Sequence, residues 1–518
     1  MLSGIQLFGI GAVAFYFLYC IANAVWSSYK VRQAAAALSC KPPPVCPTGF
    51  LGIPGLLQLA QSVKDCTTME LVANEHDKYT RTFVRPAPGA RMLMTCEPEN
   101  IKAVLATQFS DFGLGHRYEH FYPLLGDGIF TLDGAGWSHS RALLRPQFSR
   151  EQVSDVHALE IHVDHLISCF PPSGTPFDIQ ELFFRLTLDS ATEFLFGETV
   201  NSLVSSNTTN SGVPVKSTEN VLGFEEAFNS SQEYLATRSR AQKLYWLINP
   251  PEFKKSNKVV HKLVDYYVSK ALESTSKKVY NEKNKRYIFL DAVAQEIRDP
   301  KALRDQALNI LLAGRDTTSA LLSSVFYLLS RHPRVWEKLR GEILDAFGTV
   351  ESPKGQISFT SLKDIAYLRH VMDEALRLFP PVPINFRTAL KDTTIPRGGG
   401  PDGLSPIFIQ KGRDVCYSVW VMHRRKELWG EDASEFRPER WEEGKSFQNW
   451  QFLPFNGGPR ICLGQQYALT EAGFVIAKLL QMYERVETAD LQLSPAVIDA
   501  NLTMKHHHGV RVRLYSAA

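Results

Sequence analysis

A ten-residue segment, Phe455–Gly464, places one thiol among three glycines, a proline and an arginine. The residues that follow it, 465–483, have apolar side chains at helical spacing and no proline, so the segment is predicted to be a loop that leads into a helix. A cysteine at a helix N-terminus has its thiolate favoured by unpaired backbone N–H groups and by the helix dipole. Arg460 adds a permanent positive charge, and the glycines let the backbone approach a bulky flat group. The segment therefore predicts an anionic sulfur that holds a metal beside a second anion.

The spaced residues of this segment resemble the haem-binding motif F-x-x-G-x-R-x-C-x-G of the cytochrome P-450 family: they are Phe455, Gly458, Arg460, Cys462 and Gly464. The alternative is an inert buried cysteine, since free cysteine is often a core residue. The resemblance implies a mainly α-helical cytochrome P-450 fold with a smaller β-rich part. It also implies haem b as the cofactor, with Cys462 as the thiolate ligand of its iron.

Length and composition are compatible with this class of protein. The chain has 518 residues, and its hydrophobic content of 44% suits a large buried core. A net charge of +3 gives no indication of a nucleic-acid partner. The eight cysteines show no disulfide or zinc spacing, which fits a reducing compartment.

The N-terminal residues 1–29 carry no charged side chain, and Ile5–Trp26 is an apolar run of the length that spans a bilayer. A cleaved signal peptide is the alternative. No basic residue precedes the run, however, and the run is longer than a usual signal-peptide core. Lys30 and Arg32 follow it and are expected to stay cytosolic. We therefore predict an uncleaved single-pass anchor at 1–29, in the endoplasmic reticulum membrane.

The segment that follows the anchor is basic and rich in proline. Prolines fix φ and hold a chain extended, so residues 30–47 are predicted to be a stiff hinge and residues 48–518 to be the cytosolic catalytic domain. Three glycosylation sequons would then face the cytosol and remain unmodified. They begin at Asn207, Asn229 and Asn501.

A long helix is predicted over residues 299–331, because an Asp-Pro pair supplies an N-cap and a first turn. Its middle, 313–318, contains a glycine and two threonines, which are poor interior helix formers. A tolerated kink is the alternative. The segment resembles the A-G-x-D-T-T oxygen-activation motif of the same family. That resemblance implies that Gly314 leaves room for the cofactor, while Thr317 and Asp316 handle protons.

A tryptophan and an arginine, Trp137 and Arg141, are four residues apart and share one face of a predicted helix. Their N–H and guanidinium groups suit a carboxylate, although such a pair is often a surface feature. The pair resembles the family helix that binds haem propionates. By the same resemblance, Arg387 meets a propionate from a strand, and His423 is a weaker candidate for haem contact.

An acid and a base, Glu374 and Arg377, lie three residues apart on a predicted helix. Alone they would be a solvated ion pair. They resemble the family motif E-x-x-R, and residues 436–441, FRPERW, resemble its partner segment. The resemblance implies a buried structural triad with Arg440 that locks the loop of Cys462.

Residues 108–133 are rich in aromatic side chains and glycine, and we predict an irregular apolar loop there. An ordinary packed loop is the alternative; the resemblance implies a segment that lies over the haem. The predicted pocket residues, which continue into an extended stretch after Pro380, are Phe109, Phe112, Leu114, Phe121, Leu125, Phe130, Val382, Ile384 and Phe386.

Two helical patterns within residues 223–272 correspond to the lid over the substrate entrance in the resembled family. Between them, residues 244–248 either dip into the membrane surface or are buried. Near the C-terminus, His506–His508 resembles a purification tag. The chain continues past it in the strand-like run VRVRL, so we assign no metal to these histidines.

Together the motifs imply a membrane-bound haem-thiolate monooxygenase that uses O₂. Segments such as FNGGPRICLGQQYALTEAG are similar to the fungal branch that hydroxylates alkanes and fatty acids, which implies oxidation at the end of a long aliphatic chain. The sequence shows no flavin or NADPH segment, so electrons come from a separate protein, by resemblance an NADPH–cytochrome P-450 reductase. Candidate docking charges, with a solvated surface as the alternative, are Arg141, Arg145, Arg424 and Arg425.

Three other functions are kept as alternatives. The first is oxidation of a specific intermediate in fungal secondary metabolism, because an apolar pocket also suits such molecules. The second is a haem-dependent peroxide isomerase or dehydratase; such relatives often lack the acid–threonine pair that this chain has. The third is a non-enzymatic haem-binding protein.

Overall fold

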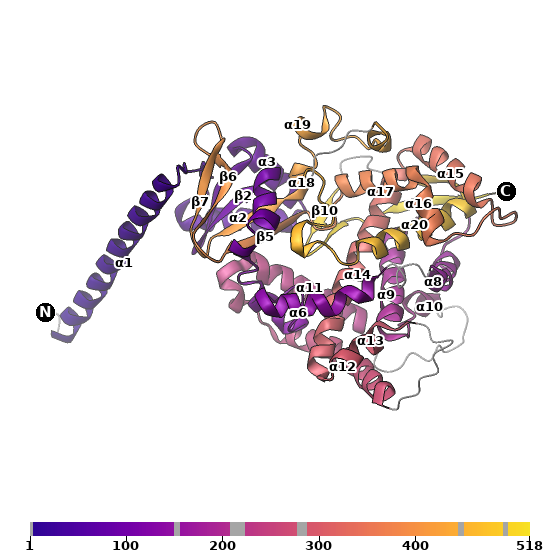
Figure 1. The fold of residues 1–518 in the computed structure, drawn as a ribbon, viewed down its shortest axis with the longest axis horizontal. Helices are drawn as coiled ribbons and strands as arrows, with labels where there is room; N and C mark the ends of the chain where they lie inside the picture. The colour runs from indigo at the N-terminus through magenta and orange to yellow at the C-terminus, as the bar shows by residue number, and fades with distance from the viewer. Residues whose placement is uncertain are drawn as a thin grey trace.

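A computed structural model describes residues 4–149, 156–207, 223–276, 287–443, 450–490 and 496–517 of the protein. Helices form most of the body, as the predicted fold class states, and the sheet that contains β2 and β5 lies at the end next to α1 (Figure 1). The helices are α1 (Gly4–Ala37), α2 (Ile53–Lys64), α3 (Thr68–Tyr79), α4 (Pro98–Lys102), α5 (Arg117–Leu125), α6 (Gly134–Leu144), α8 (His157–Ser168), α9 (Ile179–Phe196), α10 (Ser202–Asn207), α11 (Phe224–Ala241), α12 (Pro251–Ser276), α13 (Phe289–Glu296), α14 (Pro300–Leu329), α15 (Pro333–Phe347), α16 (Phe359–Asp364), α17 (Ala366–Leu378), α18 (Val419–Met422), α19 (Lys426–Trp429) and α20 (Gln465–Met482).

Strands form several small sheets. The largest has the order β1-β2-β8-β5-β3, in which β2 and β8 are parallel and the other neighbours are antiparallel. The strands are β1 (Thr82–Ala87), β2 (Ala90–Thr95), β3 (Phe112–Gly113), β4 (Phe177–Asp178), β5 (Ile384–Ala389), β6 (Thr393–Gly399), β7 (Ser405–Ile409), β8 (Asp414–Ser418), β9 (Tyr483–Thr488), β10 (Ile498–Ala500), β11 (Met504–His506) and β12 (Arg511–Ser516). Strand β12 confirms the strand predicted for VRVRL.

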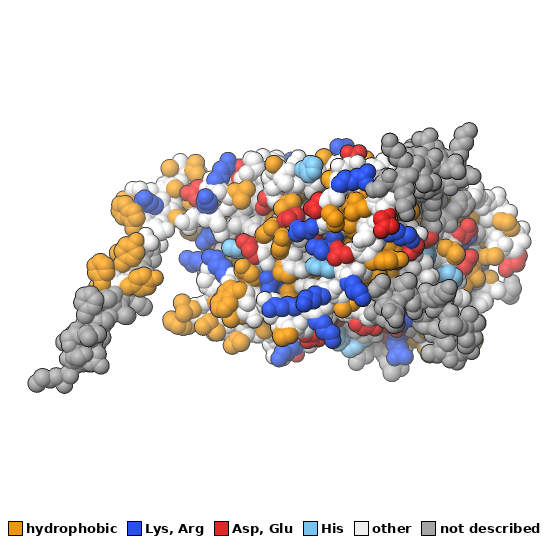
Figure 2. Space-filling view, turned by 90° about the horizontal axis from the view of Figure 1, so that it is seen from below, with side chains coloured by type: hydrophobic (Ala, Val, Ile, Leu, Met, Phe, Trp, Pro, Cys, Tyr) orange, Lys and Arg blue, Asp and Glu red, His pale blue; other side chains and the backbone are white. Residues whose placement is uncertain are grey.

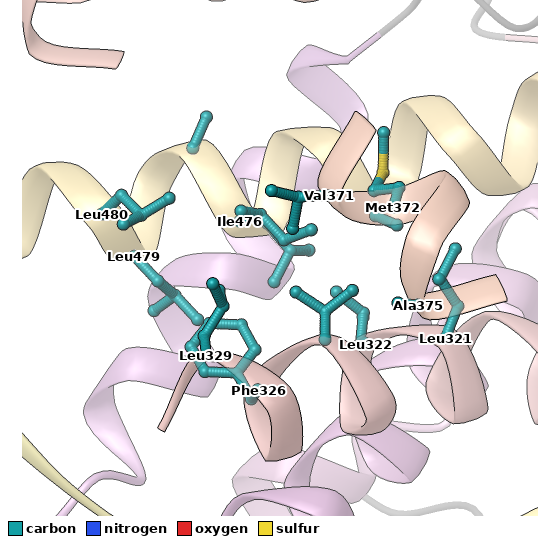
Figure 3. Packing of buried hydrophobic residues seen from close by; sticks show 14 of the residues in the cluster. Leu321, Leu322, Phe326, Leu329, Val371, Met372, Ala375, Ile476, Leu479 and Leu480 are labelled. Carbon is teal, nitrogen blue, oxygen red and sulfur yellow. The ribbon is translucent and has the colours of Figure 1, made fainter. Parts of the chain in front are cut away.

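Helix α14 crosses the body and confirms the long helix predicted over residues 299–331. The Asp299 carboxylate caps it by accepting hydrogen bonds from the N–H groups of Lys301 and Ala302. Its C-terminal half packs against α17 and α20 (Figure 3), and burying each such leucine contributes about 2 kcal/mol. The side chains of this contact include Leu321, Leu322, Phe326, Leu329, Val371, Met372, Ala375, Ile476, Leu479 and Leu480.

The segment 108–133, predicted to be an irregular loop, contains a helix, so that prediction was wrong. Helix α5 occupies Arg117–Leu125 with Pro123 inside it, and the short strand β3 precedes it. The buried His120 and Leu124 lie on this helix, which packs against α11 and α14. Tertiary packing therefore determines a helix that the glycines and the proline conceal in the sequence.

Helix α1 projects away from the body and continues to Ala37, past the predicted anchor boundary at residue 29 (Figure 1). In the described part of the chain, we find no helix that has the length and apolar character needed to span a bilayer. Residues 1–3 lie outside the description, as do many side chains of residues 4–24. The membrane anchor stays a prediction.

The segment after α1, predicted to be a stiff hinge, lies on the body. We call residues 41–46 the strap. Its backbone joins β1 and the β6–β7 hairpin, so the folded body begins before residue 48. The contacts are Lys41 N–H to Pro406 O (2.9 Å), Gly400 N–H to Pro42 O (3.1 Å), Cys46 N–H to Val84 O (2.8 Å) and Val84 N–H to Pro44 O (2.8 Å).

Candidate active site

The thiol of Cys462 lies in a tight loop just before α20. The Cys462 N–H donates to Phe455 O at 3.0 Å, and the Gly464 N–H donates to the Cys462 sulfur. Gly458 has φ +69°, and a Cβ there would lie 1.9 Å from Leu105 O. Only glycine fits that position, because the backbone conformation and the available space both exclude a side chain. The loop thus holds the sulfur in place through main-chain contacts.

A cavity of about 250 Å³ brings most of the predicted site residues together. Cys462 lines it, as do Ala313, Gly314 and Thr317 of α14. The Cys462 side chain is exposed to this cavity, while burial within the protein raises the pKa of its thiol. A metal cation bound to the sulfur would reverse that effect, since coordination favours the thiolate.

At two glycines of the cavity wall, the neighbouring protein atoms leave room for a side chain. A Cβ at Gly314 would have only Ala191 within 4 Å, at 3.9 Å, and a Cβ at Gly464 would lie 3.7 Å from the Phe148 ring. Both backbone conformations are open to other residues, because neither φ lies in the left-handed region. The absence of a side chain therefore leaves free space in the cavity, as a flat cofactor needs.

Positively charged side chains gather on the same cavity. Trp137 and Arg141 of α6, Arg387 of β5 and Arg460 all line it. The Arg460 guanidinium lies 4.3 Å from the Trp137 ring centroid, and that of Arg141 lies 5.9 Å from it. Residues far apart in the sequence therefore form one cationic side of the cavity.

A further arginine of this group, Arg117 on α5, was not predicted. It donates to Asn385 Oδ1 at 2.6 Å, and its buried Nε has no hydrogen-bond partner among the described residues. Burial and the charge of Arg387 lower the pKa of Arg117 to about 9, and the same causes lower the pKa of Arg460 to about 10. In the described part of the chain, Asp133 is the one carboxylate paired with this group, 2.6 Å from Arg460. The uncompensated charge and the unpartnered Nε fit a ligand that brings its own carboxylates.

The sequence contains a weak signal for Arg117. It is the one lysine or arginine within residues 108–133, the segment already predicted to line the pocket. Its polar partner Asn385 is 268 residues away, however, so no local pattern reveals the contact.

On α14, the two predicted proton-handling residues have different surroundings. The Thr317 hydroxyl lines the cavity and donates to Ala313 O at 2.7 Å. The Asp316 carboxyl is buried behind the wall, 3.7 Å from the guanidinium of Arg315 and hydrogen-bonded by Gln232. Burial raises the pKa of Asp316, which brings it closer to neutral pH.

The predicted charged triad is assembled and fully enclosed. Arg377 contacts Glu374 at 2.8 Å, and Arg440 contacts it at 3.2 Å, with all three side chains at most 1% exposed. Trp441 Nε1 also donates to Glu374 Oε2 at 3.1 Å. Buried charges of this kind are stable only when each one is hydrogen-bonded. The triad meets this condition, because the other guanidinium N–H groups of Arg377 and Arg440 donate to backbone carbonyls.

His423 connects this triad to the cysteine loop. Its Nδ1 lies 3.2 Å from Arg377 O, and its Nε2 accepts from the Leu453 N–H at 2.9 Å, just before Phe455. Burial lowers the pKa of His423 well below its ordinary value, which keeps the ring neutral. The ring is buried among protein atoms and is not among the residues that line the cavity, which does not fit the weaker prediction of haem contact. We infer a positioning role for His423 instead.

The predicted pocket residues divide into two groups. Leu114, Phe130 and Val382 line the cavity. The others pack elsewhere within the described structure: Phe109 against Trp137, Phe112 in strand β3, Phe121 and Leu125 in a helical core cluster, and Ile384 and Phe386 against other core clusters.

Two of the candidate docking charges are engaged inside the protein. The Arg424 guanidinium stacks 3.3 Å from the Trp420 ring centroid, and Arg425 pairs with Glu97 at 3.0 Å. Arg145 is exposed. Internal contacts use Arg424 and Arg425, so neither the docking prediction nor the solvated alternative fits these two residues.

The fold and the cavity define a haem-thiolate protein: a cysteine sulfur faces a cavity with free space beside two wall glycines and with a cationic side suited to two propionates. Comparison with known proteins gives the same class. The family described as "Cytochrome P450" matches residues 46–504. The chain is also 49% identical to cytochrome P450 52A3-B of Candida maltosa over 96% of this chain and 95% of that protein, and 49% identical to cytochrome P450 52A12 of Debaryomyces hansenii over 95% of each. It is 48% identical to cytochrome P450 52A6 of Candida tropicalis over 94% of each chain.

The chain therefore belongs to the cytochrome P450 family and is a cytochrome P450 monooxygenase. The family implies a haem-thiolate cofactor, O₂ as a substrate and a reductase as the electron donor.

Proposed function

We propose that this P450 hydroxylates the end of a long-chain fatty acid or alkane at a membrane surface. The observation that carries this proposal is the cavity that holds Cys462 and Thr317. Its wall is largely apolar, with Leu114, Ile129, Phe130, Ile310, Leu321 and Val382. Each buried methylene of a ligand contributes about 0.8 kcal/mol, so an aliphatic chain needs few polar contacts to bind. The resemblance to the fungal alkane and fatty-acid hydroxylases supports the same substrate class.

The residues of this chain have distinct roles in that reaction. When bound, haem would supply the oxygen chemistry, and the Cys462 thiolate would hold its iron. Arg117 and the other cavity arginines would bind the propionates. Thr317 Oγ1 has one donor and two acceptor sites, so it passes protons toward the reacting oxygen. Asp316, whose pKa burial raises, is the proton-exchanging group behind it.

Exposed apolar side chains support attachment to a membrane. Trp246 and Leu247 of the turn η5 (Gln242–Leu247) are 62% and 63% exposed, so the buried alternative for this segment is wrong. Phe50 and Leu51 of the turn η1 (Phe50–Gly52) are 80% and 66% exposed. Hydrophobic side chains gather at the end of the body nearest α1 (Figure 2). We propose that this end meets the lipid and that α1 anchors the protein in the endoplasmic reticulum membrane with the catalytic domain on the cytosolic side, so that apolar substrates enter by partitioning.

The substrate class is tested by reconstituting the enzyme with an NADPH-dependent P450 reductase. Lauric to oleic acids and long alkanes are supplied, and products are identified by mass spectrometry. We expect terminally hydroxylated products. Cys462→Ala is the control, and it should lose both product and the sulfur-ligation band of the reduced carbon-monoxide complex.

The fatty-acid and alkane proposal would be rejected if the enzyme keeps its haem and receives electrons from the reductase, yet hydroxylates none of these substrates. The alternative, a specific intermediate of fungal secondary metabolism, would then be screened by spectral shifts on binding. Turnover of a peroxide without reductase would instead indicate an isomerase or dehydratase.

A further inference from the structure

Three potential metal ligands converge far from the haem cavity. Cys66 follows α2, Asp499 lies on β10, and His507 follows β11. The Cys66 thiol lies 2.9 Å from Asp499 Oδ1 and 3.2 Å from His507 Nδ1. Asp499 Oδ1 and His507 Nδ1 are 2.9 Å apart. One sulfur, one nitrogen and one oxygen therefore point at a common centre.

We propose that Cys66, Asp499 and His507 form a zinc site that joins α2 to the C-terminal β10–β11 hairpin. Sulfur, imidazole nitrogen and carboxylate oxygen are the ligands that Zn²⁺ takes in proteins. Zinc bond lengths of about 2.0–2.3 Å separate tetrahedral ligands by about 3.3–3.6 Å. The observed separations of 2.9–3.2 Å are hydrogen-bonded contacts, so each ligand needs to move by only a few tenths of an ångström.

The same geometry argues against a catalytic thiol. In a Cys-His-Asp relay the thiol and the carboxylate contact different ring nitrogens, so that the ring passes a proton between them. Here both contact the same atom, His507 Nδ1. This arrangement suits three ligands around one cation.

Accessibility suits loading from solution. The Cys66 residue is 7% exposed, whereas the Asp499 and His507 side chains are 21% and 42% exposed. A zinc ion thus reaches a buried sulfur from the solvent side, and a water molecule completes the fourth position. Cys66 also adopts φ +55°, an uncommon conformation for a side-chain-bearing residue, which the three-way contact holds.

Neighbouring charges are mixed. The Lys505 ammonium lies 3.9 Å from Asp499 Oδ2, the oxygen that does not face the other two ligands. Arg240, a second positive charge that interacts with Asp499, donates to the side-chain oxygen Asn501 Oδ1 at 2.9 Å. Asp65 and Glu70 add negative charge near the sulfur. The charges around the site therefore nearly cancel, and the affinity for zinc depends on the three ligands.

The three consecutive histidines have different surroundings, which provides a matched control. His506 is buried and contacts Ser324 and Gln180. His507 belongs to the cluster. His508 is exposed, and its contact is with the His507 ring at 4.7 Å between centroids. The earlier assignment of no metal to this motif therefore changes for His507 alone.

Zinc at this position would affect the substrate cavity indirectly. The Met504 N–H of β11 donates to Pro381 O at 2.9 Å, and Pro381 lines the cavity. Strand β10 also packs against α3. Fixing the hairpin to α2 therefore restrains one part of the cavity wall.

The test uses the full haem-loaded protein after dialysis against a chelator. ZnCl₂ is titrated by calorimetry, and bound zinc and iron are counted by elemental analysis. We expect one tight zinc per haem, with X-ray absorption at the zinc edge showing one sulfur ligand. Cys66→Ser and His507→Gln should each weaken binding at least tenfold, whereas His508→Gln should bind as the parent does. Haem content measured for each variant shows that it is folded.

Hydrogen exchange gives a second measurement that does not depend on the absolute affinity. Zinc should slow exchange over residues 496–509 in the parent protein and have no such effect in Cys66→Ser. Equal zinc affinity in the parent, Cys66→Ser and His507→Gln, or a zinc shell without sulfur, would overturn the proposal.

Discussion

At the scale of single residues, Thr317 is the hydroxyl best placed to control protons in the cavity. We predict that Thr317→Ala keeps its haem but consumes NADPH with little product, releasing peroxide instead. A positioned proton donor contributes about 10²–10⁴-fold, so product per NADPH should fall at least about tenfold. Product, peroxide and NADPH are measured together.

Ser319→Ala is the matched control for this prediction. The Ser319 hydroxyl also bonds back within α14, to Arg315 O at 3.0 Å, but it is buried away from the cavity. Its coupling should match the parent. Coupling in Thr317→Ala that equals that of Ser319→Ala would remove the proton role from Thr317.

A second single-residue prediction concerns Glu471 on α20, a carboxyl that is 2% exposed. Burial raises the pKa of Glu471 from 4.5 to about 7, although hydrogen bonds from Ser190 and Thr318 and the nearby His162 oppose the shift. Because the folded state binds this proton more tightly than the unfolded state, stability from this group is complete below pH 4.5. It is lost as pH rises toward 7, by about 3 kcal/mol in total.

We therefore predict that Glu471→Gln flattens the decrease in unfolding free energy between pH 5 and 8. Urea unfolding at several pH values measures this effect. The exposed Glu484→Gln serves as the control and should keep the parent's pH dependence. An unchanged slope in Glu471→Gln would show that the carboxyl ionises normally in the folded protein.

At the scale of elements, His423 transmits the position of the triad on α17 to the loop that holds the sulfur. We predict that His423→Ala lowers the unfolding free energy by about 2–4 kcal/mol, because the Leu453 N–H and Arg377 O lose their partner in the interior. Haem should also dissociate faster. Chemical denaturation and haem transfer to an acceptor protein measure the two effects.

The half-buried His370 on α17 provides a comparison, since its Nδ1 makes no hydrogen bond among the described residues. His370→Ala should change stability by less than about 1 kcal/mol. Haem loss in His423→Ala at the same rate as in His370→Ala would contradict the positioning role.

Local patterns explain which elements the sequence predicts well. The helix over 299–331 was predictable because its cap, its first-turn proline and its apolar spacing are neighbours in the chain. The cysteine loop and α20 were predictable for the same reason. Helix α5 was not, because Pro123 and nearby glycines mask a helix that packing against α11 and α14 determines.

Distant contacts explain the remaining errors at the site. Phe112 leaves the predicted pocket because β3 pairs it with Ala389, nearly three hundred positions on in the sequence. Arg117 joins the cavity through Asn385 in the same way. A motif identifies which residue types are needed, whereas strand register and helix packing decide which side chains reach the cavity.

At the scale of the whole molecule, the strap fixes the start of the folded body. We predict that deleting residues 1–37 releases the protein from membranes with its haem and stability unchanged. Deleting residues 1–47 should release it too, but lower the unfolding free energy by about 4 kcal/mol. The difference follows from losing four strap hydrogen bonds, at about 1 kcal/mol each.

Membrane sedimentation and chemical denaturation of the two truncated proteins test this prediction. Equal stability of both forms would show that the strap contributes nothing to the body. If the form lacking residues 1–37 still sediments with membranes, we would attribute membrane attachment to the exposed side chains of η1 and η5.

The cluster of arginines around the cavity has a consequence for how the protein accumulates in a cell. Arg117 and Arg460, their pKa values lowered by burial and by Arg387, repel one another, and the carboxylates of bound haem would offset that repulsion. Binding to the folded state alone stabilises it by about 2.7 kcal/mol at a hundred times the dissociation constant. Porphyrin supply therefore acts as a folding ligand. A cell that translates this chain faster than it synthesises haem would lose the surplus to degradation, so that enzyme abundance follows cofactor production.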